Sequence, residues 1–260
     1  MKLATWNVNS IRQRLDHLAG WLARAAPDVV CVQETKVEDD RYHEDAIAEA
    51  GYKSVFFGQK TYNGVAILAR HGLAIEDVQK NLGSDEPDAQ RRLIAATIEG
   101  IRVINVYVPN GQAVGTPAFA FKLDWLGRLR DEIAERYSPG DSVLLCGDFN
   151  VAPDPIDVHD PKRWEGSVLF HPDERAALKR IVDWGFVDGF RKHHPEPKMF
   201  SWWDYRMGAY KRNWGLRIDH ALLTVPLAAR TRDVWIDKAP RELERPSDHA
   251  PVVVELNDEG

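Results

Sequence analysis

The chain has 260 residues, with 34 basic and 40 acidic side chains and a formal net charge of −6. Hydrophobic residues at 44% and charged residues at 28% are typical of a folded globular protein and exclude a disordered chain. No apolar run reaches the roughly eighteen residues that a membrane helix needs, and the N-terminal residues lack the apolar core of a secretion signal, so we expect a cytoplasmic protein with no membrane partner.

The two cysteines, Cys31 and Cys146, each lie inside an apolar run. This favours buried free thiols over a disulfide and agrees with a cytoplasmic location. No repeat, low-complexity tract or linker stands out, so residues 1–260 are expected to form a single domain. The acidic total argues by itself against a nucleic-acid partner, because binding phosphates usually needs a positive surface.

Short apolar runs rich in Val, Ile and Leu recur along the chain, and their lengths suit strands better than helices. Strands outnumber helices in this pattern, which favours a mixed α/β domain with sheet packed on sheet and helices outside. The expected strands lie at residues 3–8, 29–32, 65–68, 93–98, 103–108, 143–146, 218–223 and 252–256.

Helical spacing of apolar residues follows three recognisable start signals. The first helix is expected to begin at a capping-box pair, Ser10 and Gln13. The second is expected to begin at Thr116 and Pro117, as an N-cap followed by a first-turn proline. The third is expected to begin at Pro172.

Acidic and polar side chains follow six of the expected strands. Carboxylates and carboxamides at such positions are costly to bury alone, so they need metal, hydrogen-bond or charge partners. If the strand ends converge, they supply four carboxylates, two asparagines, a tyrosine and a histidine. These residues are Asn7, Glu34, Tyr107, Asp148, Asn150, Asp219, Asp248 and His249.

Oxygen ligands without thiolates suit a hard ion such as Mg²⁺ or Mn²⁺. A histidine beside such a site suits phosphate-ester hydrolysis, in which a metal neutralises charge and a carboxylate orients or deprotonates water. Each piece also has a simpler interpretation: Glu34 as a surface charge, residues 148–150 as a turn, and Asp219 as a structural partner of Arg217. A serine-hydrolase triad at 247–249 is excluded, because three consecutive side chains cannot adopt its geometry.

Taken together and in this order, the motifs resemble the exonuclease III branch of the exonuclease–endonuclease–phosphatase superfamily, which includes apurinic/apyrimidinic (AP) endonucleases. Gly-Asp-Phe-Asn and Ser-Asp-His mark the superfamily, which also contains inositol-phosphate phosphatases and sphingomyelinases. Ser-Trp-Trp-Asp-Tyr-Arg and Gly-Leu-Arg-Ile-Asp point to its DNA-repair branch. The matching stretches are Trp-Asn-Val-Asn at 6–9, Gln-Glu-Thr-Lys at 33–36, Tyr-Val-Pro-Asn at 107–110, and those just named at 147–150, 247–249, 201–206 and 215–219.

The resemblance implies a four-layered α/β sandwich, in which helices flank two packed mixed sheets. It implies a divalent-metal-dependent DNA-repair nuclease that hydrolyses the phosphodiester 5′ to abasic sites in duplex DNA. The family also implies 3′-5′ exonuclease activity and the cleaning of damaged 3′ ends. The implied metal is Mg²⁺ or Mn²⁺, as one ion or two.

The resemblance also implies residue roles. Asp148 would activate the attacking water and Asn150 would orient it, while His249, polarised by Asp219, and Tyr107 would contact the scissile phosphate. The implied metal ligands are Glu34, Asn7 and Asp248, with Asp248 holding either a metal or the leaving oxygen.

Residues 191–217 contain seven basic and two acidic side chains, a local charge of +5, with six interleaved aromatics. Such a segment suits nucleic acid, although a solvated basic face above an aromatic core is the alternative. The resemblance makes Trp202, Leu216 and Ile218 the walls of a pocket for a flipped-out, base-less sugar. The other expected substrate contacts are Asn110, Gln112 as the residue that wedges into DNA, Arg92 and Arg206.

Two other functions fit part of this pattern. A phosphatase or phosphodiesterase acting on a small phosphorylated molecule would use the same catalytic residues. A catalytically silent DNA-binding relative is the third possibility, because a fold does not guarantee activity. The basic, aromatic segment favours DNA over a small substrate, and the protein is expected to act as a monomer.

Overall fold

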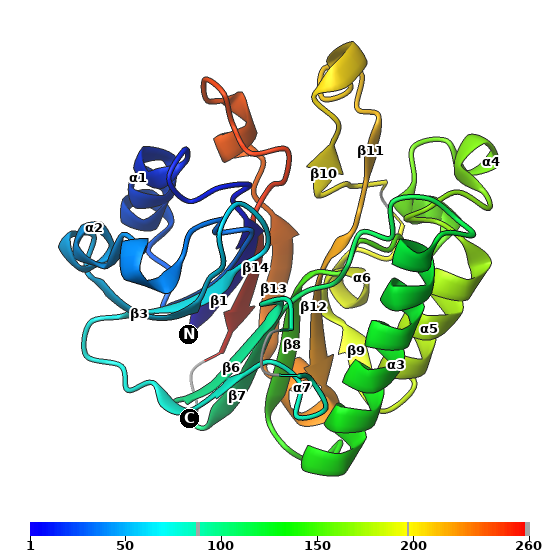
Figure 1. Ribbon diagram of the computed structural model, residues 1–260. Coiled ribbons are helices and arrows are strands. Elements are labelled where there is room, and N and C mark those ends of the chain that lie inside the picture. Colours follow the sequence, from blue (N-terminus) through cyan, green and yellow to red (C-terminus); the bar gives the residue numbers. More distant parts are fainter. Residues whose placement is uncertain (87–88, 197, 258–260) are drawn as a thin grey trace.

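The computed structural model describes residues 1–86, 89–196 and 198–257, and two six-stranded sheets packed face to face form its centre (Figure 1). In each sheet one central pair of strands runs parallel, and all other neighbours run antiparallel.

The first sheet has the strand order β13-β14-β1-β2-β4-β3. Its strands are β13 (Thr231–Ile236), β14 (Val252–Leu256), β1 (Lys2–Asn7), β2 (Val29–Gln33), β4 (Val65–Arg70) and β3 (Tyr52–Phe57). The second sheet has the order β5-β6-β7-β8-β12-β9. Its strands are β5 (Glu76–Lys80), β6 (Leu93–Ile98), β7 (Ile101–Tyr107), β8 (Val143–Asp148), β12 (Asp219–Thr224) and β9 (Phe186–Asp188).

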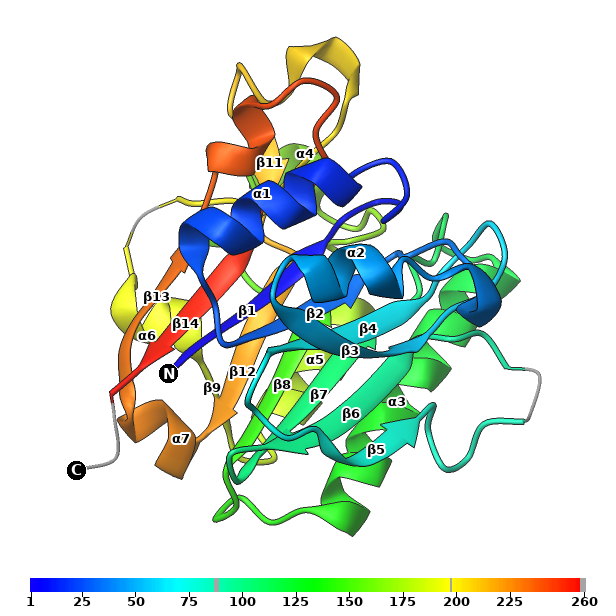
Figure 2. The same cartoon turned by 90° about the vertical axis from the view of Figure 1, so that its left-hand side faces the viewer.

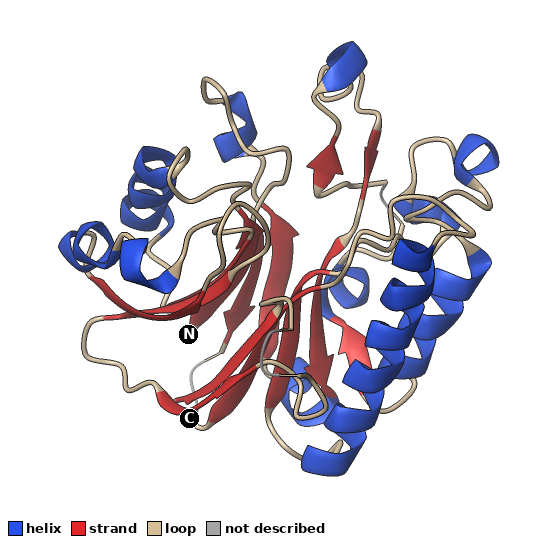
Figure 3. Cartoon of the chain, in the orientation of Figure 1, coloured by secondary structure: helices blue, strands red, loops and turns tan. Residues whose placement is uncertain are grey.

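Helices cover the outer faces of the sheets, as the colouring of Figure 3 shows. A small hairpin of β10 (Trp202–Trp203) and β11 (Gly215–Leu216) rises from one edge of the sandwich. None of the helices in the described ranges has the length and apolar character to cross a bilayer. The helices are α1 (Leu15–Ala25), α2 (Glu44–Glu49), α3 (Pro117–Arg136), α4 (Pro161–Trp164), α5 (Pro172–Val182), α6 (Gly189–His193) and α7 (Val225–Ala229).

Alternation along each strand divides the core into three apolar layers. On β8, Leu144 and Cys146 face the other sheet, whereas Val143 and Leu145 face α3 and α5. Strands of the first sheet likewise turn alternate apolar side chains toward α1 and α2. Figure 2 shows these two helices in front of β1 to β4. Because side chains alternate between the faces of a strand, each apolar run of the sequence fills two layers at once. The predicted four-layered α/β sandwich is confirmed.

The start of the second and third helices is confirmed, but that of the first is wrong. Thr116 caps α3 by accepting a hydrogen bond from the N–H of Phe119, and α5 begins at Pro172. Ser10, however, has a φ of 85°, and its N–H donates to the carbonyl of Glu34 at 2.8 Å. The segment before α1 therefore follows the loop after β2, and the helix begins only at Leu15.

Both cysteines are free and buried, as predicted. The expected strands are all present, with boundaries that shift by one or two residues. The sequence pattern missed β3, β5, β9, β13 and the β10–β11 hairpin, which are short, lie at sheet edges or outside the sheets, or carry many polar residues. Such strands bury little of one face and so lack a clear alternating pattern.

The backbone geometry at Gly147 explains why the Gly-Asp-Phe-Asn motif begins with glycine. Its φ is +141°, and a Cβ there would lie 1.9 Å from the carbonyl oxygen of Val106 on the neighbouring strand β7. Any larger residue would force the two parallel strands apart. Glycine therefore keeps β7 and β8 adjacent where their ends carry Tyr107 and Asp148.

Candidate active site

The polar residues at the strand ends meet at one edge of the sandwich, the upper edge in Figure 1. β1 with β2, and β7 with β8, are the two parallel pairs, so the carboxyl ends within each pair are neighbours. A hydrogen bond of 2.9 Å from Asn7, at the end of β1, to Asp148, at the end of β8, joins the two pairs across the sheets. β12 runs antiparallel to β8 in a register that places its first residue, Asp219, opposite Asp148. The convergence expected from the sequence is therefore present in the structure.

Glu34, Asp148 and His249 form a compact cluster, with ligand atoms that all lie within 4.8 Å of one another. The side-chain amide of Asn7 links the two carboxylates, donating to Glu34 Oε1 at 2.8 Å and to Asp148 Oδ2 at 2.9 Å. Burial raises the pKa of Asp148 to about 7, against the lowering effect of His249, and the nearby carboxylates of Asp219 and Glu34 add to the rise.

His249 is held by the carboxylate of Asp219. Its Nδ1–H lies 2.9 and 3.0 Å from the two carboxylate oxygens of Asp219, and its Nε2 lies 3.7 Å from Asp148 Oδ2. Burial acts to lower the pKa of His249, but Asp219 and Asp148 outweigh it and raise the pKa to about 10. The imidazole is therefore charged at neutral pH, with Nδ1 fixed by Asp219.

Ser201 is a supporting residue to which the sequence pattern assigned no role. Its hydroxyl oxygen accepts hydrogen bonds from the backbone N–H groups of Ile218 at 3.1 Å and Asp219 at 3.0 Å. It therefore anchors the start of β12, where Asp219 meets His249. The only signal for it was its place in the Ser-Trp-Trp motif.

Asn150 lies behind Asp148 and is fixed by several partners. Its amide donates to the carbonyl of Val108 at 3.0 Å and lies 3.3 Å from Asp148 Oδ2, and its Oδ1 accepts from Asn110 Nδ2 at 3.1 Å. The buried Lys122 Nζ donates to the backbone carbonyls of both Asn150, at 2.6 Å, and Asn110, at 3.1 Å. One ammonium group thus holds the two loops that carry these asparagines.

Lys122 itself is completely buried and forms an ion pair with Glu174 of α5, which is also completely buried. Sequence reasoning missed this pair. Lys122 shares the helical spacing of the apolar residues Phe119, Leu126 and Leu129, so a lysine on the apolar face of α3 was the available signal.

Tyr107 and Arg92 form a second buried pair at the site. The Arg92 guanidinium lies 4.8 Å from the centre of the Tyr107 ring, and its NH1 donates to the Tyr107 carbonyl at 3.1 Å. Burial, together with Glu34 and Asp148, raises the pKa of Tyr107, so its hydroxyl keeps its proton. Arg92 is only 8% exposed, so a phosphate that it contacts must enter the same site as Tyr107.

Asp248 lies beside the carboxylate cluster but not in it. Its two oxygens accept hydrogen bonds from Asn9 Nδ2 and Trp202 Nε1, both at 2.9 Å. The Lys36 ammonium lies between Glu34 Oε2 and Asn9 Oδ1, at 2.6 Å from each. Through its hydrogen bond with Trp202, Asp248 orients the tryptophan of the expected sugar pocket.

The expected sugar pocket is closed in this structure. Leu216 is 0% and Ile218 1% exposed, both within an apolar cluster against which Trp164 and Trp202 pack. Of the three expected walls only Trp202 has appreciable exposed surface. Gln112 is exposed with a φ of 54°, and the exposed Arg206 is bound by the carboxylate of Asp204.

Part of the basic segment at 191–217 turns out to be structural. Arg217 is buried between Asp157 and Asp188, with contacts of 2.7 Å to each, and Arg191 also binds Asp157. Lys192 donates to the hydroxyl of Thr231 at 2.7 Å. The cations that remain for a ligand in this segment are Lys198, Lys211, Arg212 and, beside Asp204, Arg206.

This arginine–aspartate network predicts a pH effect on stability. Burial raises the pKa of Asp157, but Arg217 and Arg191 outweigh it and hold the pKa below its ordinary value of 3.8. A depressed folded-state pKa stabilises the fold fully above about pH 4, and this contribution is lost as pH falls through the folded pKa. Asp157→Asn should therefore cost about 1–3 kcal/mol at neutral pH, because Arg217 keeps only Asp188, and should weaken the pH dependence of unfolding in acid.

Urea unfolding of wild type and variant from pH 7 to pH 3 measures both effects. Asp131→Asn, at an exposed ion pair, is the matched control and should change little. Equal acid sensitivity of wild type and Asp157→Asn would contradict the assignment.

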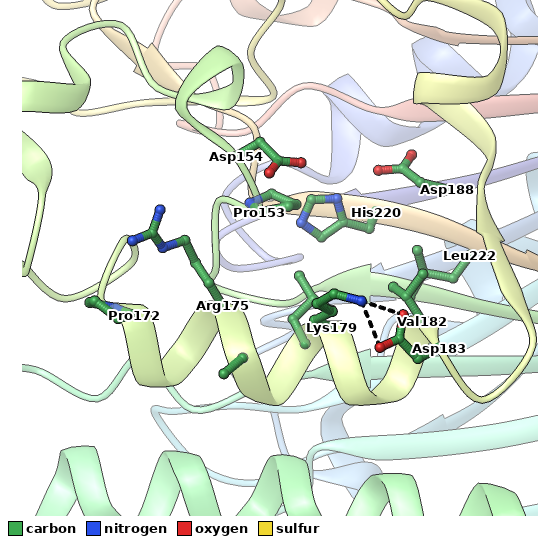
Figure 4. Close-up of a pocket in the computed structure, with 12 residues that line it drawn as sticks. Pro153, Asp154, Pro172, Arg175, Lys179, Val182, Asp183, Asp188, His220 and Leu222 are labelled. Atoms are coloured by element: carbon green, nitrogen blue, oxygen red, sulfur yellow. Dashed lines mark hydrogen bonds and ion pairs between the residues drawn. The ribbon is translucent and has the colours of Figure 1, made fainter.

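A separate cavity of about 460 Å³ lies behind the site, on the face of β12 toward α5 (Figure 4). His220 lines it and is fixed by the carbonyl of Val151 at 2.8 Å. Its cations are already paired: Lys179 binds Asp183 and Arg175 binds Glu165, each at 2.6 Å. This cavity therefore has apolar walls and a neutralised rim, unlike the catalytic edge.

The donor set at the catalytic edge fits a hard divalent ion. Glu34 and Asp148 place carboxylate oxygens close together without a thiolate. Burial is the main cause of the raised pKa of Asp148, and the nearby carboxylates of Asp219 and Glu34 add to it, so a cation bound here would offset both effects. Glu34 is the member of the cluster that would hold the ion, with the Asp148 carboxylate beside it. The charged His249 is not a ligand, because its Nδ1 is bound to Asp219 and its Nε2 carries a proton.

A two-sheet α/β sandwich with a carboxylate–histidine cluster at one edge defines a class of metal-dependent phosphoesterases. The chain belongs to the Endonuclease/Exonuclease/phosphatase family, whose model matches residues 4–249. The family expected from the sequence is thus confirmed; the family is metal-dependent, and the cluster of Glu34, Asp148 and His249 is a place where this chain could bind a metal.

Relatives match over nearly the whole chain. Exodeoxyribonuclease III of Haemophilus influenzae is 35% identical over 98% of this chain and 100% of its own length, and an exodeoxyribonuclease of Bacillus subtilis is 34% identical over 99% and 100%. An AP endonuclease structure from Archaeoglobus fulgidus superposes with a TM-score of 0.95 at 44% identity, covering 99% of this chain and 100% of that one. The 3′-5′ exonuclease NExo of Neisseria meningitidis gives 0.94 at 42%, with the same coverage.

Proposed function

We propose that this DNA-repair nuclease hydrolyses the phosphodiester 5′ to abasic sites in duplex DNA, and also removes nucleotides or blocking groups from damaged 3′ ends. The observation that carries the proposal is the cluster of Glu34, Asp148 and His249, with Asp219 behind the histidine. The exonuclease and AP endonuclease relatives support the choice of DNA as substrate.

Asp148 is the residue that activates water. A general base works best when its pKa lies near the working pH, and burial raises the pKa of Asp148 to about 7. Asn150, fixed against Val108 and Asn110, presents its amide beside Asp148 and orients the same water. The attack is in line with the leaving oxygen and needs no covalent enzyme intermediate.

His249 and Tyr107 stabilise the phosphate during attack. The charged His249 directs its Nε2–H toward the site, while Asp219 holds the other ring nitrogen. Tyr107 donates a hydrogen bond to the same phosphate, because burial raises its pKa and its hydroxyl keeps the proton. Hydrogen bonds from fixed donors to developing charge are among the largest contributions to catalysis.

The proposed metal ligands are Glu34, Asn7 and Asp248. When bound, Mg²⁺ or Mn²⁺ neutralises charge on the phosphate and on the leaving oxygen. Asn7 at present donates its amide to Glu34 and Asp148, so it acts at least as the link that holds the two carboxylates together. Asp248 either holds an ion or supports the leaving oxygen through its contacts with Asn9 and Trp202.

The proposed substrate contacts surround this centre. Trp202, Leu216 and Ile218 form the sugar pocket, which must open because two of its walls are buried in the structure. Arg92 contacts the phosphate at Tyr107, and Asn110, Gln112 and Arg206 contact DNA at the rim, with Gln112 as the wedge. We further propose a monomer acting in the cytoplasm, which the two free buried thiols support.

Metal removal tests the central claim. A duplex with a single abasic analogue should be nicked 5′ to the lesion with Mg²⁺ or Mn²⁺, and nicking should stop in EDTA and return when the ion is restored. A time course on a sequencing gel separates internal nicks from 3′ shortening. Equal cutting with and without EDTA, or no cutting under either condition, would contradict the proposal.

A small-molecule phosphatase of the same family is the second candidate. It is favoured only by the shared catalytic cluster, whereas Lys198, Lys211 and Arg212 favour a polyanion. Undamaged duplex DNA should inhibit turnover of a small phosphate ester by the DNA nuclease. Turnover that DNA leaves unchanged would support the phosphatase instead.

A further inference from the structure

Two adjoining hollows are lined by residues of α4 and of the β10–β11 hairpin. Figure 1 shows this hairpin at the upper edge of the sandwich. One has a volume of about 360 Å³ and is called here the tryptophan hollow; it is lined by His159, Trp164, Trp202 and Trp214 among others. The other, of about 440 Å³, is called the basic hollow. They share His159, Arg163 and Trp214, so a single ligand can reach both.

The tryptophan hollow presents aromatic rings that are only half buried. The ring of His159 is nearly parallel to that of Trp214, with centroids 6.1 Å apart, and meets Trp164 edge-on at 6.2 Å. Burial lowers the pKa of His159, so this ring is neutral at neutral pH. Three tryptophans around one hollow form a surface suited to a flat aromatic ligand.

The basic hollow is lined by Arg163, Lys198 and Arg212. Lys198 reaches only the carbonyls of Val158 and His159, at 3.3 and 3.5 Å, and the Arg212 guanidinium lies 4.6 Å from the centre of the Trp214 ring. Across the described parts of the chain, none of the three cations is paired with a carboxylate. They are therefore free to bind an anion.

The nearby acids offset this charge only in part. Asp160 also lines the basic hollow, where it caps α4 by accepting from the backbone N–H of Arg163 at 3.2 Å, so one carboxylate stands against the three cations. Asp204 is bound by the side chain of Arg206 through both carboxylate oxygens, at 3.0 Å for Oδ1 and 2.5 Å for Oδ2. The basic hollow thus keeps a net positive charge beside an aromatic one.

Trp202 connects these hollows with the catalytic centre. It lines the tryptophan hollow, its Nε1 donates to Asp248 at 2.9 Å, and its backbone pairs with that of His249. A DNA strand with its scissile phosphate against His249 therefore has a neighbouring nucleotide within reach of Trp202.

We propose that the two hollows bind one unpaired nucleotide of the DNA substrate, with its base on Trp164 and Trp214 and its phosphate at Arg163 and Arg212. A paired base keeps its faces stacked in the duplex, so only an unpaired base can offer a face to these rings. The site would favour frayed, mismatched or overhanging ends beside the scissile phosphate. This inference rests on the proposed DNA nuclease function.

Binding without catalysis tests it. Fluorescence anisotropy in EDTA compares a labelled hairpin duplex that ends blunt with the same duplex carrying one unpaired 3′ nucleotide. Wild type should bind the overhang more tightly. Trp164→Ala and Trp214→Ala should each reduce this preference, by about 5- to 100-fold for a lost base–aromatic stack, and Trp164→Phe should retain most of it. Trp184→Ala, at a half-buried tryptophan outside both hollows, is the matched control.

The cations are tested by salt dependence. Arg163→Ser and Arg212→Ser should each lower the slope of log affinity against log salt by roughly 0.7 for the overhang, whereas Arg232→Ser, at an exposed arginine of β13, should not. Equal wild-type affinity for blunt and overhang duplexes would overturn the proposal. So would tryptophan variants that weaken both duplexes equally, since the hollows would then contact paired DNA.

Failure of the proposed function would look different. Binding is measured without metal, so a protein that never nicks an abasic duplex can still show the overhang preference. Conversely, efficient nicking without any overhang preference would leave the nuclease function standing and remove only this site.

Discussion

Asp148→Asn should reduce nicking of an abasic duplex by about 10²- to 10⁴-fold, the range that loss of a positioned general base produces. The amide keeps the size of the side chain, and its one oxygen can keep the contacts with the side chains of Asn7 and Asn150. Its NH2 group cannot accept the backbone N–H of Asn150, and the side chain can no longer accept a proton from water. Single-turnover nicking with Mg²⁺ measures the loss in the chemical step.

DNA binding separates a catalytic role for Asp148 from a structural one. The variant should bind the abasic duplex in EDTA about as tightly as wild type, and its melting temperature should not fall, since the substitution removes a buried negative charge. Asp154→Asn, at an exposed carboxylate in the loop after the same motif, is the matched control and should cut normally. Unimpaired cutting by Asp148→Asn would mean that another group activates the water.

Lys122→Met should give the largest loss of stability, about 3–5 kcal/mol, because it leaves the carboxylate of Glu174 buried without its partner. For a chain of this size the melting temperature should fall by roughly 10 °C. Lys179→Met removes an exposed ion pair of similar geometry and should cost less than about 1 kcal/mol. Urea unfolding with both variants measures the difference in unfolding free energy.

A double variant tests the explanation. Lys122→Met with Glu174→Leu should recover part of the stability, since an apolar pair carries no buried charge. Nicking should remain reduced in the double variant, because the carbonyls of Asn110 and Asn150 lose their common donor. A single variant as stable as wild type would show that Glu174 is satisfied without Lys122.

The catalytic cluster was predictable because its members lie at the ends of apolar strands. Once β1, β2, β7 and β8 are recognised, parallel pairing brings Asn7 beside Glu34 in one sheet and Tyr107 beside Asp148 in the other. The packing of the two sheets then brings these two pairs together. The pairing of His249 with Asp219, by contrast, was available only from the resemblance to a family. Their proximity depends on how the two sheets pack, which no local pattern encodes.

The segment 191–217 shows that a count of charges along the sequence does not tell which of them can bind a ligand. The sequence carries a local +5 there, yet Arg191 and Arg217 are paired with carboxylates outside the segment, Asp157 and Asp188. Of the three cations of the basic hollow, Lys198 and Arg212 belong to this segment and Arg163 comes from α4. A charged side chain interacts with what is near in space, over about 10 Å at moderate salt, so only the fold decides which charges are free.

The residues alone determined the strand-rich α/β class, the start of two helices and the type of chemistry, because apolar spacing, caps and ligand types are local properties. The tertiary structure decided which polar groups meet: Lys122 with two loops, Asp248 with Trp202, and three tryptophans around one hollow. It also decided which cations of the basic segment remain for a substrate. A negative net charge is therefore compatible with a DNA nuclease. Many charged side chains are buried or paired with one another, and a few cations remain exposed where the substrate must lie.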